Sequence, residues 1–281
     1  MNRVEFPQVN KEWAAVARSI NHNLRPTVRV TLCDVTFTLR AEARPAGSDR
    51  DYAILRQLAR GKQCIFDVGA NVGLTSLVMA GPAPAGAGPA EDGRIIAFEA
   101  SEAACRLIRD NAALNGLSGR ISVVNALVAE RSGLALDFYG DAASGSASII
   151  PGYLAHHHPL RKVTLALDDF VNDFGLVPDL IKIDVEGAEL RVVAGLVETL
   201  RTARPLAFIE LHSWGDLTVD HTADALLEQL RPLDYCLVYL RTKEIVTDTA
   251  VLAGRGRCHV LACPNESPFL DTLAQLDTAG L

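Results

Sequence analysis

A glycine-spaced turn directly after a short apolar run constrains this chain more than any other feature. Residues 64–73 read Cys-Ile-Phe-Asp-Val-Gly-Ala-Asn-Val-Gly, and the apolar residues from Leu74 onward predict a buried helix. A strand, a tight turn and a helix N-terminus together let the backbone approach a nucleotide-like ligand closely. Gly69 and Gly73 have no Cβ, so this turn can adopt dihedrals that other residues avoid. Any α/β domain can carry such a turn, so a ligand site needs further support.

A second apolar run ends in an acidic residue. Residues 94–99, Arg-Ile-Ile-Ala-Phe-Glu, predict a strand that ends at Glu99, and Ser101 is typical of the N-cap of a following helix. A carboxylate at the tip of the second strand commonly binds both ribose hydroxyls of an adenosine. The alternative for Glu99 is a solvated strand end. The Gly81–Gly93 segment is rich in Pro, Gly and Ala and predicts a surface loop between the two motifs.

The residues of the turn favour one of two adenosine cofactors. A dinucleotide fingerprint prefers a glycine where the pyrophosphate meets the backbone, and here that position is Asn71. The charge of Asp67 would oppose a pyrophosphate but suits a ligand with an ammonium and a sulfonium, which is S-adenosylmethionine. We expect this cofactor to be bound by Asp67, Gly69, Asn71, Gly73, Glu99, Asn125 and Asp184.

Taken together, the motifs resemble those of the FkbM-type methyltransferases. The segments that carry the likeness are 67–73, 97–99, 167–169, 181–189 and 209–212, within a region from about Asp49 to His212. Ala100 and Ser101 depart from the proline-containing turn that this family usually shows after the acid. The resemblance implies a class I methyltransferase fold, S-adenosylmethionine as methyl donor, and hydroxyl acceptors on sugars or secondary metabolites.

The order of elements predicts a doubly wound, Rossmann-like α/β domain with a mostly parallel sheet. The resemblance adds that the sheet has seven strands and an antiparallel last strand. Residues 49–281 form the expected methyltransferase domain. Residues 1–48 are expected to form an N-terminal extension, with a helix over 13–24 and a β-hairpin that turns at Cys33 and Asp34. This extension either covers the pocket or forms a homodimer contact, and both alternatives stay open.

Polar residues gather where the fourth and fifth core strands are expected to end. Asp184 and Glu186 follow the strand 178–183, and His212 follows the strand 205–211. Alternation along an extended chain sends Asp184 and Glu186 to the same side, so both can face the pocket. A histidine that titrates near neutrality suits removal of a hydroxyl proton. We therefore expect His212 to be the general base, with Asp184 and Glu186 orienting the acceptor or the base.

Each of these residues also has a structural alternative. Asp184 could be a helix N-cap, Glu186 could favour the helix dipole, and His212 could be a satisfied structural histidine. Glu189 is expected to be structural, since it falls inside the helix that follows the strand 178–183 and includes 190–200. Glu210 could face a helix in an ion pair. The alternative to a general base is a divalent metal, bound by Asp184, Glu186 and His212, that acts as a Lewis acid on the acceptor oxygen. The spacing of these residues does not assign a metal site.

The composition excludes several other classes of function. The net charge of −7 and the lack of a basic stripe argue against a nucleic-acid partner. The six cysteines form no Cys-x-x-Cys pair, so free thiols in a reducing compartment are expected. No apolar run is long enough for a membrane span or a signal peptide, which favours a cytoplasmic enzyme without a membrane partner.

The acceptor has no recognisable code in the sequence. A small-molecule hydroxyl is expected, and the alternatives are N- or C-methylation or a non-catalytic cofactor-binding assembly subunit. The 141–162 loop, which contains His156, His157 and His158, is expected to be an acceptor lid or a plain surface loop rather than a metal site.

Overall fold

The computed structural model describes residues 25–45, 51–81, 90, 93–140, 148–150, 159–213 and 216–278. The helix expected over 13–24, the three consecutive histidines and most of the loop between the two adenosine motifs lie outside the described residues. Among the described residues, no helix is both long and apolar enough to cross a bilayer.

The described chain contains strands, α-helices and short 3-10 helices. The strands are β1 (Thr27–Leu32), β2 (Val35–Arg40), β3 (Cys64–Val68), β4 (Arg94–Glu99), β5 (Ile121–Asn125), β6 (Leu127–Val128), β7 (Ala135–Phe138), β8 (Leu160–Leu165), β9 (Leu180–Ile183), β10 (Leu206–His212), β11 (Tyr235–Tyr239), β12 (Glu244–Ile245) and β13 (Arg257–Pro264). The α-helices are α2 (Asp51–Leu58), α3 (Leu74–Ala80), α4 (Glu102–Leu114), α5 (Leu167–Phe174), α6 (Glu189–Ala194), α7 (Val197–Ala203) and α8 (Val219–Leu230). The 3-10 helices are η1 (Ala41–Ala43), η2 (Arg231–Leu233), η3 (Thr249–Leu252) and η4 (Pro268–Gln275).

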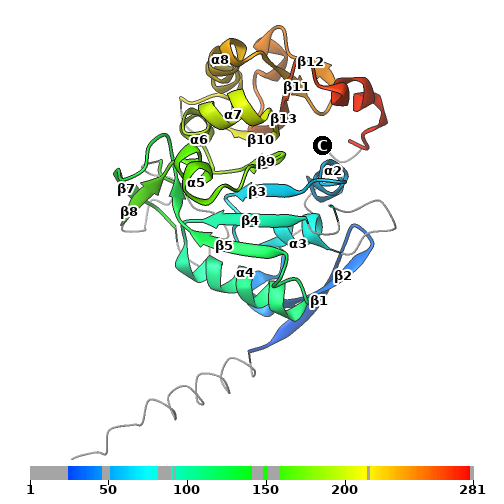
Figure 1. The fold of residues 1–281 in the computed structure, drawn as a ribbon, viewed down its shortest axis with the longest axis vertical. Coiled ribbons are helices and arrows are strands. Elements are labelled where there is room, and N and C mark those ends of the chain that lie inside the picture. The colour runs from blue at the N-terminus through cyan, green and yellow to red at the C-terminus, as the bar shows by residue number, and fades with distance from the viewer. Residues whose placement is uncertain are drawn as a thin grey trace, which may run out of the picture.

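A mostly parallel sheet forms the centre of the molecule (Figure 1), with the strand order β12-β11-β13-β10-β9-β3-β4-β5. Strand β13 runs antiparallel to both β10 and β11, while β3, β4, β5, β9 and β10 are mutually parallel. The predicted class I fold with an antiparallel last strand is confirmed, and the two-residue β12 adds an eighth strand. The strand order reverses at β3 and β9, and ligands of such sheets bind at the carboxyl ends beside this reversal.

Helices cover both faces of the sheet because alternate strand residues point to opposite sides. Ile65 of β3 belongs to a hydrophobic cluster with residues of α2, α3, α4 and the β1–β2 hairpin. The next residue, Phe66, belongs to a second cluster with residues of α5, α6, α7 and α8. Both faces of β3 are therefore buried, as the continuous apolar run in the sequence predicts for a central parallel strand.

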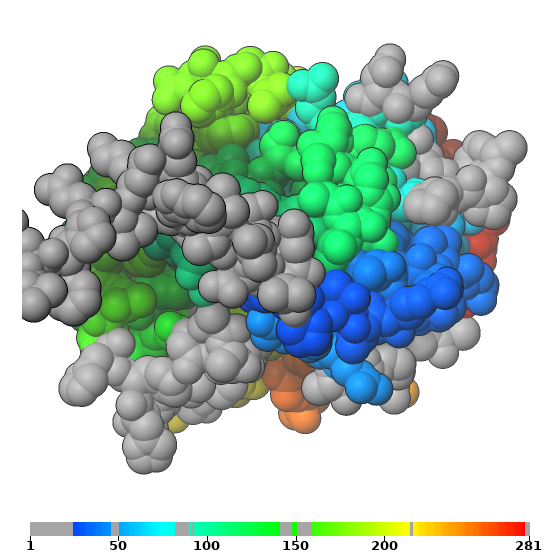
Figure 2. Space-filling view, turned by 90° about the horizontal axis from the view of Figure 1, so that it is seen from below, coloured from blue at the N-terminus to red at the C-terminus, as the bar shows by residue number. Residues whose placement is uncertain are grey.

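The N-terminal hairpin packs into the same core as the sheet. Cys33 and Asp34 have φ values of 47° and 63°, so a two-residue turn joins β1 and β2 as predicted. The Thr38 N–H donates to Oδ1 of Asn115, the C-cap of α4, at 2.9 Å, and Phe37 is buried in the core cluster on that face. Figure 2 shows the hairpin, in blue, lying against α4, in green. The hairpin thus completes the hydrophobic core on one face of the sheet.

The single helix expected over 190–200 is instead two helices, α6 and α7. A Cβ on Gly195 would lie 2.3 Å from the carbonyl oxygen of Ala129, so the chain passes too close to its neighbour for any other residue. The Gly195 carbonyl accepts the N–H of Asp168, and the Asp168 carboxylate accepts the N–H of Thr199 at 2.8 Å. This carboxylate from α5 caps the N-terminus of α7, and the break in the helix is a tertiary effect.

Gly69 is required by the neighbouring strand and not only by a ligand. Its φ is +74°, and a Cβ there would lie 1.8 Å from the carbonyl oxygen of Asp184. The Gly69 N–H donates to the Phe98 carbonyl at 3.0 Å, which fixes the turn against β4. The turn therefore fits between β4 and the end of β9 only without a side chain.

We predict that Gly69→Ala lowers the free energy of unfolding by about 2–5 kcal/mol, because left-handed backbone and overpacking both contribute. Gly61→Ala is the matched control, since Gly61 has a φ of +69° but nothing within 4 Å of its Cβ position. It should cost only the backbone term, about 1–2 kcal/mol. Urea unfolding of both variants measures the difference, and equal costs would contradict the close approach of Asp184.

Candidate active site

A pocket opens at the carboxyl ends of β3, β4 and β9. Its empty volume, including the part that is open to solvent, is about 780 Å³. Its apolar wall includes Phe98, Leu127, Val128, Phe138, Ile149 and Val185. Its polar residues are Asn71, Glu99, Ser101, Ser148, Asp184 and Glu186.

Glu99 joins the glycine turn to the start of α4. Its carboxylate accepts the Asn71 N–H at 2.8 Å and the Ser101 N–H at 2.7 Å, one on each oxygen. Burial raises the pKa of Glu99 above the usual carboxyl value, although both N–H groups act in the opposite direction. A carboxylate has about four acceptor positions, so two remain for further donors such as a ribose diol.

Three residues predicted to bind the cofactor lie outside the pocket lining. Asp67 is fully buried, and its carboxylate accepts the hydroxyls of Thr75 and Ser76 at the start of α3. Gly73 has a φ of +87°, and a Cβ on it would lie 3.1 Å from the Ile108 side chain of α4, so the left-handed backbone and a tight helix contact both favour glycine here.

Asn125 is the third of these residues. Its Nδ2 donates to the carbonyls of Glu99 and Ala100, which fixes the ends of β4 and β5 together. Asp67, Gly73 and Asn125 therefore shape the pocket from behind, while Gly69, Asn71, Glu99 and Asp184 line it.

The structure brings Asp184, Glu186 and His212 together, as the sequence predicted. His212 Nε2 lies 3.4 Å from Glu186 Oε2 and 3.8 Å from Asp184 Oδ1. The side chains of Asp184 and Glu186 are 28% and 26% exposed and line the pocket, whereas that of His212 is 8% exposed and lies behind them. The two carboxylates are thus the groups of this trio that face the pocket.

Glu189 has a role that the sequence analysis missed. It is fully buried, and its Oε1 accepts the Gly187 N–H at 2.9 Å and lies 3.0 Å from His212 Nδ1. This contact directs Nε2 of His212 toward the pocket carboxylates. Burial would lower the pKa of His212, but the hydrogen bond to Glu189 and the charge of Asp184 raise it to about 9.

Lys182 is a further residue whose role the motif did not reveal. Its side chain is almost completely buried, and its Nζ donates to the Gly69 carbonyl at 3.0 Å. Nζ also lies 3.2 Å from Asp184 Oδ2 and 3.5 Å from Asp67 Oδ1. Burial opposes its charge, but Asp184 and Asp67 raise the pKa of Lys182 above the usual lysine value. The sequence signal for this buried role is a single lysine within the otherwise apolar strand β9.

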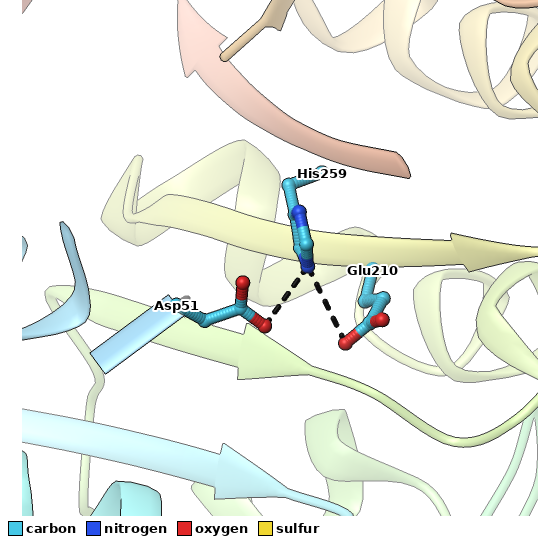
Figure 3. A group of neighbouring side chains, drawn as sticks. All are labelled: Asp51, Glu210 and His259. Carbon is cyan, nitrogen blue, oxygen red and sulfur yellow. Dashed lines mark ion pairs between the residues drawn. The ribbon is translucent and has the colours of Figure 1, made fainter. Parts of the chain in front are cut away.

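A second histidine lies beyond the pocket on β13. Glu210 stands between the two imidazoles, with Oε1 3.6 Å from His212 Nε2 and Oε2 3.5 Å from His259 Nε2. His259 Nε2 lies 2.9 Å from Asp51 Oδ2 at the start of α2 (Figure 3). Arg257 contacts Glu210 at 2.9 Å, so the ion pairs of Glu210 are with a strand and not with the helix that the sequence suggested.

Three of the solved structures that are similar to this chain are methyltransferases, and each has a low sequence identity to it. A SAM-dependent methyltransferase from Agrobacterium tumefaciens is 14% identical, with a TM-score of 0.50 over 95% of this chain and 74% of that chain. Methyltransferase FkbM from Methylobacillus flagellatus is 17% identical, with a TM-score of 0.44 over 72% of this chain. An O-methyltransferase from Bacillus cereus in complex with SAH is 15% identical, with a TM-score of 0.45 over 92% of each chain.

This chain spans 44% of the length of the Methylobacillus flagellatus protein. A search of curated protein sequences gave no significant match. The model of the FkbM methyltransferase domain, in contrast, matches residues 67–235, which is more than half of the chain and includes the glycine turn, Glu99 and the catalytic candidates. This match confirms the predicted family and the predicted cofactor, S-adenosylmethionine. The chain belongs to the FkbM methyltransferase family.

Proposed function

We propose that this chain transfers a methyl group from S-adenosylmethionine to a hydroxyl of a small molecule, a sugar or a secondary metabolite. The observation that carries this proposal is the arrangement of carboxylates around one pocket. Glu99 ends β4 on one side of β3 and has acceptor positions to spare, whereas Asp184 and Glu186 follow β9 on the other side of β3 and have an imidazole behind them.

The residues present fit the cofactor. Glu99 would hold the ribose hydroxyls, Phe98 and Leu127 would contact the adenine, and the carboxylate of Asp184 would face the cationic part. When bound, the cofactor supplies an electrophilic methyl group on a sulfonium. The chain has to align the acceptor with this group and remove water from between them.

The acceptor hydroxyl must also lose its proton, because a neutral hydroxyl is a poor nucleophile. Asp184 and Glu186 are the candidate proton acceptors, since they reach the pocket. His212 lies behind both carboxylates and contacts them through Nε2. In this proposal His212 is a positioning residue that holds the two carboxylates, a change from its expected role as the general base.

Labelled S-adenosylmethionine and a library of hydroxyl, amine and carbon acceptors test the proposed reaction. Transfer to hydroxyl compounds is expected. Transfer only to amines or to carbon would replace O-methylation by N- or C-methylation. Tight binding of S-adenosylhomocysteine with no transfer to any acceptor would favour a non-catalytic assembly subunit.

Glu99→Ala is predicted to weaken S-adenosylhomocysteine binding by about 1–3 kcal/mol, the usual cost of removing one partner of a buried polar group. Glu102→Ala is the control, because Glu102 is the first residue of α4, close to Glu99 in the sequence, and its side chain is 72% exposed. Calorimetry gives both affinities, and melting curves show that each variant is folded. Unchanged affinity in Glu99→Ala, or tighter binding of a nicotinamide dinucleotide, would refute the ribose assignment.

Asp184→Asn and Glu186→Gln are each predicted to preserve folding and to lower the single-turnover rate at least about tenfold, because an amide keeps the shape but cannot accept the proton. Glu198→Gln is the control, since this carboxylate is exposed and pairs with Arg201 on α7. Rates and melting temperatures are measured on the same preparations. A lower melting temperature with a normal rate in the folded fraction would indicate a structural role.

His212→Ala is predicted to lower the single-turnover rate by about 10²-fold through misplacement of the carboxylates, while S-adenosylhomocysteine affinity stays unchanged. A merely structural histidine would lower the affinity and the rate together. A normal rate in Glu186→Gln and Asp184→Asn, combined with a loss of more than about 10³-fold in His212→Ala, would restore His212 as the general base.

A further inference from the structure

Asp51, Glu210 and His259 form a buried triad that the proposed methyl transfer does not use. They come from α2, β10 and β13, and each is more than nine-tenths buried. None of the three lines the pocket. We propose that this triad binds a divalent first-row transition-metal ion such as Mn²⁺, with one imidazole and two carboxylates as its ligands. The inference does not rest on the proposed function.

The spacing of the ligand atoms matches one shared ion. His259 Nε2 lies 2.9 Å from Asp51 Oδ2 and 3.5 Å from Glu210 Oε2, and all three ligand atoms lie within 4.8 Å of one another. Two N or O ligands bound at about 2.0–2.2 Å to one ion stand roughly 3 Å apart when they are neighbours in its coordination sphere. Figure 3 shows both carboxylates facing the Nε2 edge of the ring from different elements.

Two polar atoms of the triad lack a hydrogen-bond partner. Asp51 Oδ1 and His259 Nε2 are both buried without one, and the close contacts of Nε2 with the two carboxylates do not have hydrogen-bond geometry. Buried polar atoms are rarely left in this state, and an ion is a common explanation. A metal ion among the three side chains would use the Nε2 lone pair and the carboxylate together.

The charges around the triad also favour a cation. A continuous set of ion pairs runs through the described residues from the glycine turn to α2. Its carboxylates are Asp51, Asp67, Asp184, Glu186, Glu189 and Glu210. Its cationic side chains are Lys182, His212, Arg257 and His259. With His259 neutral, as metal binding through Nε2 requires, six negative charges face at most three positive ones, and a divalent ion would offset most of this excess.

A second group of possible ligands, Asp184, Glu210 and His212, shares Glu210 with the triad. It is the weaker candidate, because Asp184 already contacts the ammonium of Lys182 at 3.2 Å and has a side chain that is 28% exposed. We therefore place the ion on the triad with His259. There it would join the start of α2 to β10 and β13 and fix the orientation of Glu210 beside His212.

Titration of the full chain with MnCl₂, followed by electron paramagnetic resonance, tests the site. The protein is first stripped by dialysis against a chelator. One Mn²⁺ per chain is expected, and His259→Gln and Asp51→Asn should each weaken its binding at least about tenfold. His221→Gln is the control, since His221 is an exposed histidine of α8, and it should bind as the parent does. His212→Gln should also retain binding.

Two further measurements keep the result decisive if a variant does not fold. Pulsed resonance on the parent should detect one imidazole nitrogen coupled to Mn²⁺, and its melting temperature should rise with added MnCl₂. Circular dichroism shows which variants are folded. The inference is overturned if the parent binds no Mn²⁺ or shows no nitrogen coupling. It is equally overturned if binding persists in folded His259→Gln, or if His212→Gln loses it.

Discussion

The buried ammonium of Lys182 joins the two halves of the candidate site. It donates to the Gly69 carbonyl in the glycine turn and contacts both Asp67, below the turn, and Asp184, at the pocket. A buried charge is costly unless it is paired, and without Lys182 the fully buried carboxylate of Asp67 would keep the hydroxyls of Thr75 and Ser76 but no cationic partner among the described residues. The position of the cofactor turn and the position of the pocket carboxylate are therefore set by the same group, and neither can shift alone.

The other end of the site is organised by imidazoles. Four carboxylates lie within 4 Å of His212, and the same Glu210 that contacts it also contacts His259. In a low-dielectric interior these contacts are strong only while each charge keeps its partner. The acidic groups at the pocket are thus one end of a network that extends through the sheet to α2. The chemistry of the pocket and the packing of α2 depend on the same charges.

The parts of the site whose position at strand ends the sequence predicted are contiguous motifs. The glycine turn and Glu99 each sit at a strand end, where the chain direction and the class I strand order determine their position. For Gly69, the sequence analysis predicted that the missing Cβ serves the turn and the ligand. In the structure, the missing Cβ also makes room for the Asp184 carbonyl. Asp67 and Asn125 were predicted as ligand contacts, but they support the turn and the strand ends. A motif shows that a residue type is needed, and it does not show which neighbour needs it.

By itself, the sequence predicted a mostly parallel α/β sheet and an S-adenosylmethionine site, because apolar runs and glycine-spaced turns act locally, and the resemblance of its motifs implied the family and the class I fold. Only the tertiary structure decided which charges meet. Glu210 and His259 are paired across β10 and β13 by strand register, and Asp51 reaches them from the opposite end of the chain. The division of the predicted 190–200 helix at Gly195 likewise depends on the distant carbonyl of Ala129. Contacts of this kind follow from the packing of the sheet and its helices, and no local pattern encodes them.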